Sequence, residues 1–209
     1  MLLWPGVALA QCPAPGMAKT APVTFKTELA EPVYRNDRKR DELTTSSADA
    51  LGTPEVQKSG LTRVQFRFEV VPSFQWVALP DGRTCMALKE VQATWRMTDL
   101  VVDVAAEYRP GTCQYREVRA HEDQHVRFNR DTFLEHAPRM EARLKTVAHD
   151  MRPTITDLDP ERTMQAMAER LSHAAGEVQA SFEAAIAARH ATIDTAESYK
   201  AVSRRCDKW

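Results

Sequence analysis

Apolar residues change their spacing once along this chain, and that change constrains the fold more than any other feature of the sequence. Over residues 61–71 apolar and polar side chains alternate, which predicts a half-buried strand that ends at Pro72. From residue 114 onward, apolar side chains recur at steps of three and four, the period of a helix with one buried face. A sheet followed by helices is typical of an α+β fold.

The sheet is predicted to be an antiparallel meander. Besides the strand that ends at Pro72, further strands are expected over residues 23–29, 74–79, 84–95 and 100–108. The pair Asp81-Gly82 predicts a hairpin turn between two of them. The polar stretch 35–60 predicts a loop, with a short helix over residues 41–51.

Three helices are expected in the second half. The first should cover residues 114–136, because Pro138 is expected to break it and to begin the second helix. Asp159 and Pro160 have the residue types of a helix N-cap and a first helical position. They predict a third, long helix that continues to Ser203.

Composition limits what this chain can be. It has 209 residues, 43% hydrophobic and 27% charged, which suits a folded core, and residues 23–209 are expected to form a single domain. The net charge of −1 does not favour nucleic acid or an anionic membrane as a partner. No stretch is long and apolar enough to predict a membrane span.

The N-terminus and the cysteines indicate export. Residues 1–10 are apolar and end in Ala-Leu-Ala, so they are predicted to be the remnant of a signal peptide, followed by an extended leader over 11–22. The even cysteine count fits disulfides in a secreted or periplasmic protein. Of the three possible pairings, the preferred one joins Cys85 with Cys113 and Cys12 with Cys206.

The first predicted helix contains a motif with specific chemistry, HExxH, formed by His121, Glu122 and His125. Four residues of α-helix return to nearly the same side, so the two imidazoles can bind one metal ion. Glu122 can then act as the general base on a water held by that ion. This arrangement predicts a zinc site.

The surrounding residues place this motif on a buried helix face. Apolar Val118 and Phe128 fall on the same side as the two histidines, and charged residues such as Arg119 and Asp123 fall on the opposite side. The longer motif HExxHxxGxxH is not present, because its glycine position holds Phe128. Asp131, at the third-ligand position of that motif, is expected to be a surface charge.

A catalytic zinc usually has three protein ligands, so a third must come from elsewhere. The apolar stripe of the long helix turns polar near its end, where Asp194 and Glu197 fall at core-facing positions. Polar residues at such positions need a partner, and a metal ion is one. Asp194 is the preferred third ligand, with Glu197 and Glu141 as alternatives.

The apparent export, the strands, the HExxH helix and a late Asp-containing segment together resemble a bacterial family described as predicted secreted Zn-dependent proteases. This is a HExxH zincin-like domain of otherwise unknown function. The resemblance covers roughly residues 23–200 and is specific mainly at the HExxH motif. It implies a zincin-like fold, a bound Zn²⁺ and a peptide or protein substrate. The family's late segment carries Asp, Thr and a His-Gly pair; Asp194-Thr195 keeps the first two, and the His-Gly pair is missing.

These observations predict an exported zinc metallohydrolase, most readily a peptidase. His121, His125 and Asp194 would bind zinc, and Glu122 would take a proton from the attacking water. Tyr199 is a candidate for stabilising the oxyanion. Two alternatives are a non-catalytic envelope binding or structural protein with a vestigial or structural metal site, and a zinc hydrolase of a non-peptide amide.

Overall fold

The computed structural model describes residues 12, 17, 19–51, 57–157 and 159–209. The predicted signal peptide and most of the predicted leader therefore lie outside the described residues. Within them the chain forms four helices and a five-stranded sheet, so the predicted α+β class is confirmed. The zincin-like arrangement stays a prediction. None of the described helices combines the length and the apolar character needed to cross a membrane.

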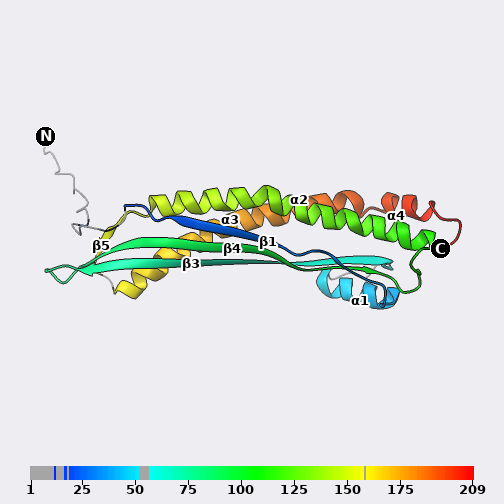
Figure 1. Ribbon diagram of the computed structural model, residues 1–209, viewed down its shortest axis with the longest axis horizontal. Coiled ribbons are helices and arrows are strands. Elements are labelled where there is room, and N and C mark those ends of the chain that lie inside the picture. The colour runs from blue at the N-terminus through cyan, green and yellow to red at the C-terminus, as the bar shows by residue number, and fades with distance from the viewer. Residues whose placement is uncertain (1–11, 13–16, 18, 52–56, 158) are drawn as a thin grey trace, which may run out of the picture. The chain divides into compact units, whose positions relative to one another are not determined.

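The elements follow one another in a simple order (Figure 1). The strands are β1 (Val23–Leu29), β2 (Val33–Arg35), β3 (Gly60–Ala78), β4 (Thr84–Val104) and β5 (Thr154–Thr156). The helices are α1 (Arg40–Leu51), α2 (Cys113–Asp150), α3 (Pro160–Ile193) and α4 (Ala196–Ser203).

The chain divides into two compact units. The first contains the described residues up to Lys26, Glu69–Thr94 and Pro138–Val178. The second contains Thr27–Phe68, Trp95–Ala137 and Gln179–Trp209. The long elements β3, β4, α2 and α3 each contribute residues to both units.

The predicted antiparallel meander is wrong. β4 is the common strand, and every other described strand pairs with it. β2 runs parallel to β4, with Val33 opposite Val101, whereas β5 runs antiparallel to it, with Thr84 opposite Thr156. The physical reason is the length of β4. It has 21 residues, so the short strands β1, β2 and β5 can each pair with a different part of it.

Two breaks expected in the sheet are absent. β3 continues through Pro72, and β4 continues through Asp99, which adopts a positive φ of 53°. Among the described strands β3 pairs with β4 alone, and an edge strand tolerates proline where its nitrogen faces away from the neighbour. The hairpin turn is confirmed, since Leu79 and Arg83 are joined by a backbone hydrogen bond of 2.7 Å.

The first unit encloses an aliphatic core. Its innermost side chains come from β4, α2 and α3 and include Met86, Leu88, Met140, Leu144 and Leu171. An ion pair of 2.8 Å between Arg143 and Glu177 joins α2 to α3 at the surface. The helical residues of this core belong to the apolar stripes that the helical period predicts.

The second unit has an aromatic core. Each of its four long elements contributes one ring: Phe66 from β3, Trp95 from β4, Phe133 from α2 and Phe182 from α3. The ring centroids of Trp95 lie 4.8 Å from Phe133 and 4.9 Å from Phe182, and Phe66 lies 4.7 Å from Phe182. Aromatic pairs at this spacing contribute packing energy beyond their buried area. They fix α2 and α3 against the strands.

The preferred disulfide pairing is wrong. Cys12 bonds Cys85, within the first unit, and Cys113 bonds Cys206, within the second. The chain turns back after α4, so Cys206 bonds the first residue of α2, Cys113, instead of Cys12. An ion pair of 2.9 Å between Arg205 and Glu117 lies beside this disulfide.

Two helix boundaries also differ from the prediction. α2 continues through Pro138 as one helix of 38 residues. Proline costs the helix one bond, to the carbonyl of Leu134, and both residues are exposed, so water can bond that carbonyl. The helix expected to reach Ser203 instead ends at Ile193, and α4 begins three residues later. Asp159 caps α3 as predicted, accepting a bond of 3.1 Å from the amide of Glu161.

Candidate metal centre

α2 supplies two histidines that lie one turn apart and face inward. His121 and His125 are only 6% and 7% exposed, and Val118 and Thr132 are buried on the same face. The predicted buried face of this helix is therefore confirmed. The opposite face carries Asp123, whose carboxylate accepts a bond of 2.7 Å from the hydroxyl of Tyr34 in β2.

Asp194 reaches the histidines because the long helix breaks at this residue. The amide of Asp194 donates the last helical bond, to His190 at 3.0 Å. Thr195 then adopts an extended backbone conformation, and its hydroxyl caps α4 by accepting a bond of 3.0 Å from Ser198. One oxygen of Asp194, Oδ1, lies 3.4 Å from Nε2 of His121 and 3.3 Å from Nε2 of His125.

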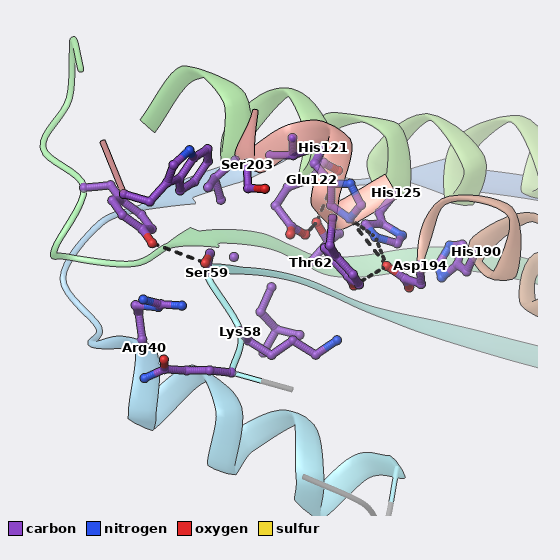
Figure 2. A pocket seen from close by; sticks show the side chains of 18 residues that line it. Arg40, Lys58, Ser59, Thr62, His121, Glu122, His125, His190, Asp194 and Ser203 are labelled. Atoms are coloured by element: carbon purple, nitrogen blue, oxygen red, sulfur yellow. Dashed lines mark hydrogen bonds and ion pairs between the residues drawn. The ribbon is translucent and has the colours of Figure 1, made fainter. Parts of the chain in front are cut away.

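The three donor atoms have the spacing of a metal site. The two histidine Nε2 atoms lie 3.3 Å apart, so the three atoms form a nearly equilateral triangle (Figure 2). Tetrahedral ligands at about 2.0–2.1 Å from zinc lie about 3.3–3.4 Å from one another. His121, His125 and Asp194 could therefore hold a metal ion, and three protein ligands leave one tetrahedral position open.

Hydrogen bonds keep Asp194 ionised. Burial acts against its charge, but bonds from His121, His125 and Tyr199 hold the pKa of this carboxyl well below its usual range. The bond from the Tyr199 hydroxyl is 2.8 Å long. Burial and this same bond raise the pKa of Tyr199. Tyr199, predicted as an oxyanion donor, therefore contacts the third candidate ligand.

Glu122 lies beside the triangle and is 5% exposed. Its Oε2 accepts a bond of 2.8 Å from the hydroxyl of Thr62, near the start of β3. Burial raises the pKa of its carboxyl, and His125 and the Thr62 hydroxyl act in the opposite direction. A carboxyl whose pKa is raised is a stronger base for a proton transfer near neutral pH.

Gly60 allows β3 to approach Glu122. A Cβ atom at this position would lie 2.7 Å from both Glu122 Oε1 and Val118 Cγ1, closer than van der Waals contact permits. Sequence reasoning missed both Gly60 and Thr62, because neither belongs to the HExxH motif. A glycine directly before an alternating strand is the signal that could have drawn attention to this contact.

A third histidine adjoins the group. The ring of His190 lies 4.7 Å from that of His125. Its Nε2 is buried and has no hydrogen-bond partner among the described residues. Burial and the neighbouring His125 lower the pKa of His190, which favours the neutral imidazole.

The other candidate ligands lie outside the triangle. Glu197 is exposed on α4 and is not part of the group. Glu141 belongs to the first unit and bonds Lys145 at 2.6 Å. Asp131 is exposed, as predicted. Asp194 is therefore the carboxylate that the fold brings to the two histidines.

The metal centre opens into a cavity of about 390 Å³ within the second unit. His121, Glu122 and Asp194 line it, together with residues that include Tyr108 and Trp209. The candidate ligands are therefore accessible to a small molecule or to a segment of a peptide. Compared with known protein families, with curated proteins and with solved structures, the chain gives no match.

Proposed function

We propose that this protein is a metal-dependent hydrolase that cleaves peptide bonds, with zinc as the metal. The observation that carries the proposal is the triangle of donor atoms from His121, His125 and Asp194, with sides of 3.3–3.4 Å. A buried carboxylate, Glu122, lies next to it in the same cavity. Two imidazoles and one carboxylate are a common ligand set of catalytic zinc.

The proposed roles follow from position and charge. Zinc at this site would supply a Lewis acid for a substrate carbonyl and lower the pKa of a water molecule. Glu122 accepts the proton of the attacking water and passes it to the leaving nitrogen, and its raised pKa suits both steps. Thr62 orients Glu122, and Tyr199 holds the carboxylate of Asp194 toward the histidines.

The open edge of β3 supports a peptide as the substrate. β3 begins at Gly60, which contacts Glu122, and among the described strands it pairs with β4 alone. A strand with one free edge can bind an extended peptide through backbone hydrogen bonds. Such a peptide would pass the metal centre at the start of β3.

The disulfides support an exported protein as part of this proposal. Both pairs of cysteines are oxidised, and free cysteines are absent from the described residues. Disulfides persist in oxidising compartments such as the periplasm and the extracellular space. A secreted or periplasmic peptidase would act on proteins or peptides in the same compartment.

Metal content and hydrolysis test the proposal separately. The wild type should contain about one zinc per chain by elemental analysis, and His121→Ala should lose most of it, because two ligands bind zinc far more weakly than three. Glu122→Gln should keep zinc and lose the cleavage of a degenerate peptide library, read by mass spectrometry. Equal zinc in the wild type and His121→Ala would refute the site. Full activity of zinc-loaded Glu122→Gln would refute the general base.

One observation favours the alternative of a non-catalytic envelope binding protein. Nδ1 of His121 is buried and has no hydrogen-bond partner among the described residues. Metal-ligating histidines usually donate this second nitrogen to a carboxylate or carbonyl, which orients the ring and tunes the metal for its chemistry. This alternative predicts a zinc-loaded wild type that cleaves no member of the peptide library.

A further inference from the structure

The cavity that contains the metal centre has a second charged region. Its lysine and arginine residues are Lys58 and Arg40, and its aspartate and glutamate residues are Glu122 and Asp194. The two carboxylates belong to the metal centre. Figure 2 shows both cationic side chains across the cavity from the histidines, with Lys58 nearer to the metal centre and Arg40 farther from it. The wall across from the histidines therefore carries two positive charges at different distances from the metal centre.

In the part of the chain that the structure describes, the two cations lack the partners that most surface cations find. Among the described residues, neither the Arg40 guanidinium nor the Lys58 ammonium forms an ion pair, and Nε of Arg40 is buried without a hydrogen-bond partner. Glu107 accepts a bond of 3.3 Å from the backbone amide of Arg40, not from its guanidinium. By contrast, Arg63 pairs with Asp103 at 2.6 Å in the same unit.

Aromatic rings hold both cations on the cavity wall. The Lys58 ammonium lies 5.7 Å from the centroid of the Tyr199 ring, and the Arg40 guanidinium lies 5.9 Å from that of Tyr108. The faces of aromatic rings attract cations at this distance. Tyr199 also bonds Asp194, so a single tyrosine side chain separates Lys58 from the metal centre.

α1 fixes the backbone of both residues. Arg40 is the first residue of this helix, and the amide of Lys58 donates a bond of 2.8 Å to the hydroxyl of Thr44. The helix is anchored by Leu43, which is fully buried in a cluster that includes Val118 of α2. The backbone that carries the two cations is therefore held in place by the fold.

We propose that Arg40 and Lys58 form a subsite for a carboxylate of the substrate, which makes this protein selective for acidic peptides. This inference rests on the proposed peptidase function, since it assigns the substrate class of the same site. An anionic group would give the buried guanidinium nitrogen a partner, and an arginine binds a carboxylate through two parallel bonds. Lys58 is one tyrosine side chain away from the metal centre, and an extended peptide advances about 3.3 Å per residue, so a carboxylate bound by Lys58 belongs to a residue near the cleaved bond.

Binding to an inactive protein tests the subsite without requiring hydrolysis. The probes are acetylated and amidated alanine-based hexapeptides with one Glu at each position in turn, and a matched set with Gln. They are titrated calorimetrically into zinc-loaded Glu122→Gln. At least one Glu peptide should bind about tenfold more tightly than its Gln counterpart, because hydrogen bonds to charged groups are the stronger ones. A third set, with Gln and a free C-terminal carboxylate, distinguishes a side-chain carboxylate from a terminal one.

The charge variants identify the residues responsible. Arg40→Gln and Lys58→Gln, each added to Glu122→Gln, should remove most of the preference for the carboxylate and leave the binding of the Gln peptides unchanged. Arg67→Gln is the matched control, because Arg67 is an exposed arginine of the same unit outside the cavity. Circular dichroism confirms that each variant is folded.

The outcomes separate this inference from the proposed function. Equal binding of the peptide sets, including no detectable binding of any, overturns the subsite, as does a preference that survives when both cations are replaced. A wild type that binds the acidic peptides selectively and cleaves none of them keeps the subsite and removes the hydrolase.

Discussion

Gly60 controls how closely β3 approaches the carboxylate of Glu122, the proposed general base. Its hydrogen occupies the place where a methyl group would meet Glu122 and Val118. We expect Gly60→Ala to displace the Glu122 carboxylate, because that carboxylate is more easily moved than the backbone of two long elements. A misplacement of about 1 Å at a reacting group can lower the rate about a hundredfold. Peptide cleavage should therefore fall by about this factor while zinc content stays near one per chain.

The same substitution elsewhere is the control for this prediction. Gly176 in α3 has open space around the position of a Cβ atom, and alanine is the better helix former. Gly176→Ala should leave cleavage unchanged and slightly raise the melting temperature. Unchanged cleavage in a zinc-loaded Gly60→Ala would show that Glu122 is not held in place by this contact.

Residue spacing alone predicted the part of the site that one helix supplies. The four-residue step from His121 to His125 fixes both rings on one face, and Glu122 follows from the motif. Asp194 was predictable only as a polar residue in an apolar stripe. Thr62 and Lys58 could not be predicted, because they come from a strand start and a loop that carry no motif. Their position depends on how β3 lies against α2.

At the scale of elements, the break between α3 and α4 brings Asp194, the third candidate ligand, to the two histidines. Thr195 caps α4, and removing a threonine cap costs about 1 kcal/mol. We expect Thr195→Ala to lower the melting temperature by about 2–4 °C. It should also weaken zinc binding severalfold, because α4 carries Tyr199, which positions Asp194. Differential scanning calorimetry and competition with a zinc chelator measure the two effects.

A variant of a second helix cap, Asp159, distinguishes the loss of stability from the loss of zinc affinity. Asp159 caps α3 in the first unit, away from the ligands in sequence. Asp159→Ala should cost similar stability and leave the affinity for zinc unchanged. If both variants weaken zinc binding equally, the effect comes from general destabilisation, and the specific role of the break is wrong.

Element type was easier to predict from the sequence than element ends. The alternation in β3 and the stripe of α3 are properties of local periodicity, and both are present. Proline lacks an amide hydrogen, so the sequence predicts an end at Pro72 and at Pro138. In the fold, Pro72 lies in β3, which among the described strands pairs with β4 alone, and Pro138 lies on the exposed face of α2. Such surroundings are set by tertiary packing, which local sequence does not report.

At the scale of the whole molecule, the proposed metal links folding to binding. The candidate ligands from α2 and from the α3–α4 break meet only in the folded chain, so the proposed zinc would bind the native state and stabilise it. At a free zinc concentration about a hundred times the dissociation constant, the gain is about 2.7 kcal/mol. For a chain of this length that corresponds to a rise in melting temperature of about 5–10 °C.

Thermal denaturation with and without zinc measures this linkage. His121→Ala is the control and should show little shift, because it lacks one of the three donors. His173→Ala is matched to it in residue type, and His173 is an exposed histidine outside the group. It should behave like the wild type. An equal zinc shift in His121→Ala would mean that zinc stabilises the protein from another site.

The sequence predicted the fold class but not the topology. Segment order was enough for α+β, because strands precede helices along most of the chain. The pairing of β2 with β4 and both disulfides depend on contacts between distant segments. Cys206 reaches Cys113 only because the chain reverses after α4, and nothing near Cys206 in the sequence signals that reversal.

The Cys113–Cys206 disulfide closes a covalent loop of the chain around the proposed metal ligands. It joins residues 93 positions apart, and His121, His125 and Asp194 all lie inside the resulting ring. Even when the fold is lost, the ring limits how far Asp194 can move from the histidines. The effective concentration of the third ligand therefore stays higher than in an open chain, so an oxidised chain should recapture zinc more readily on refolding than a reduced one.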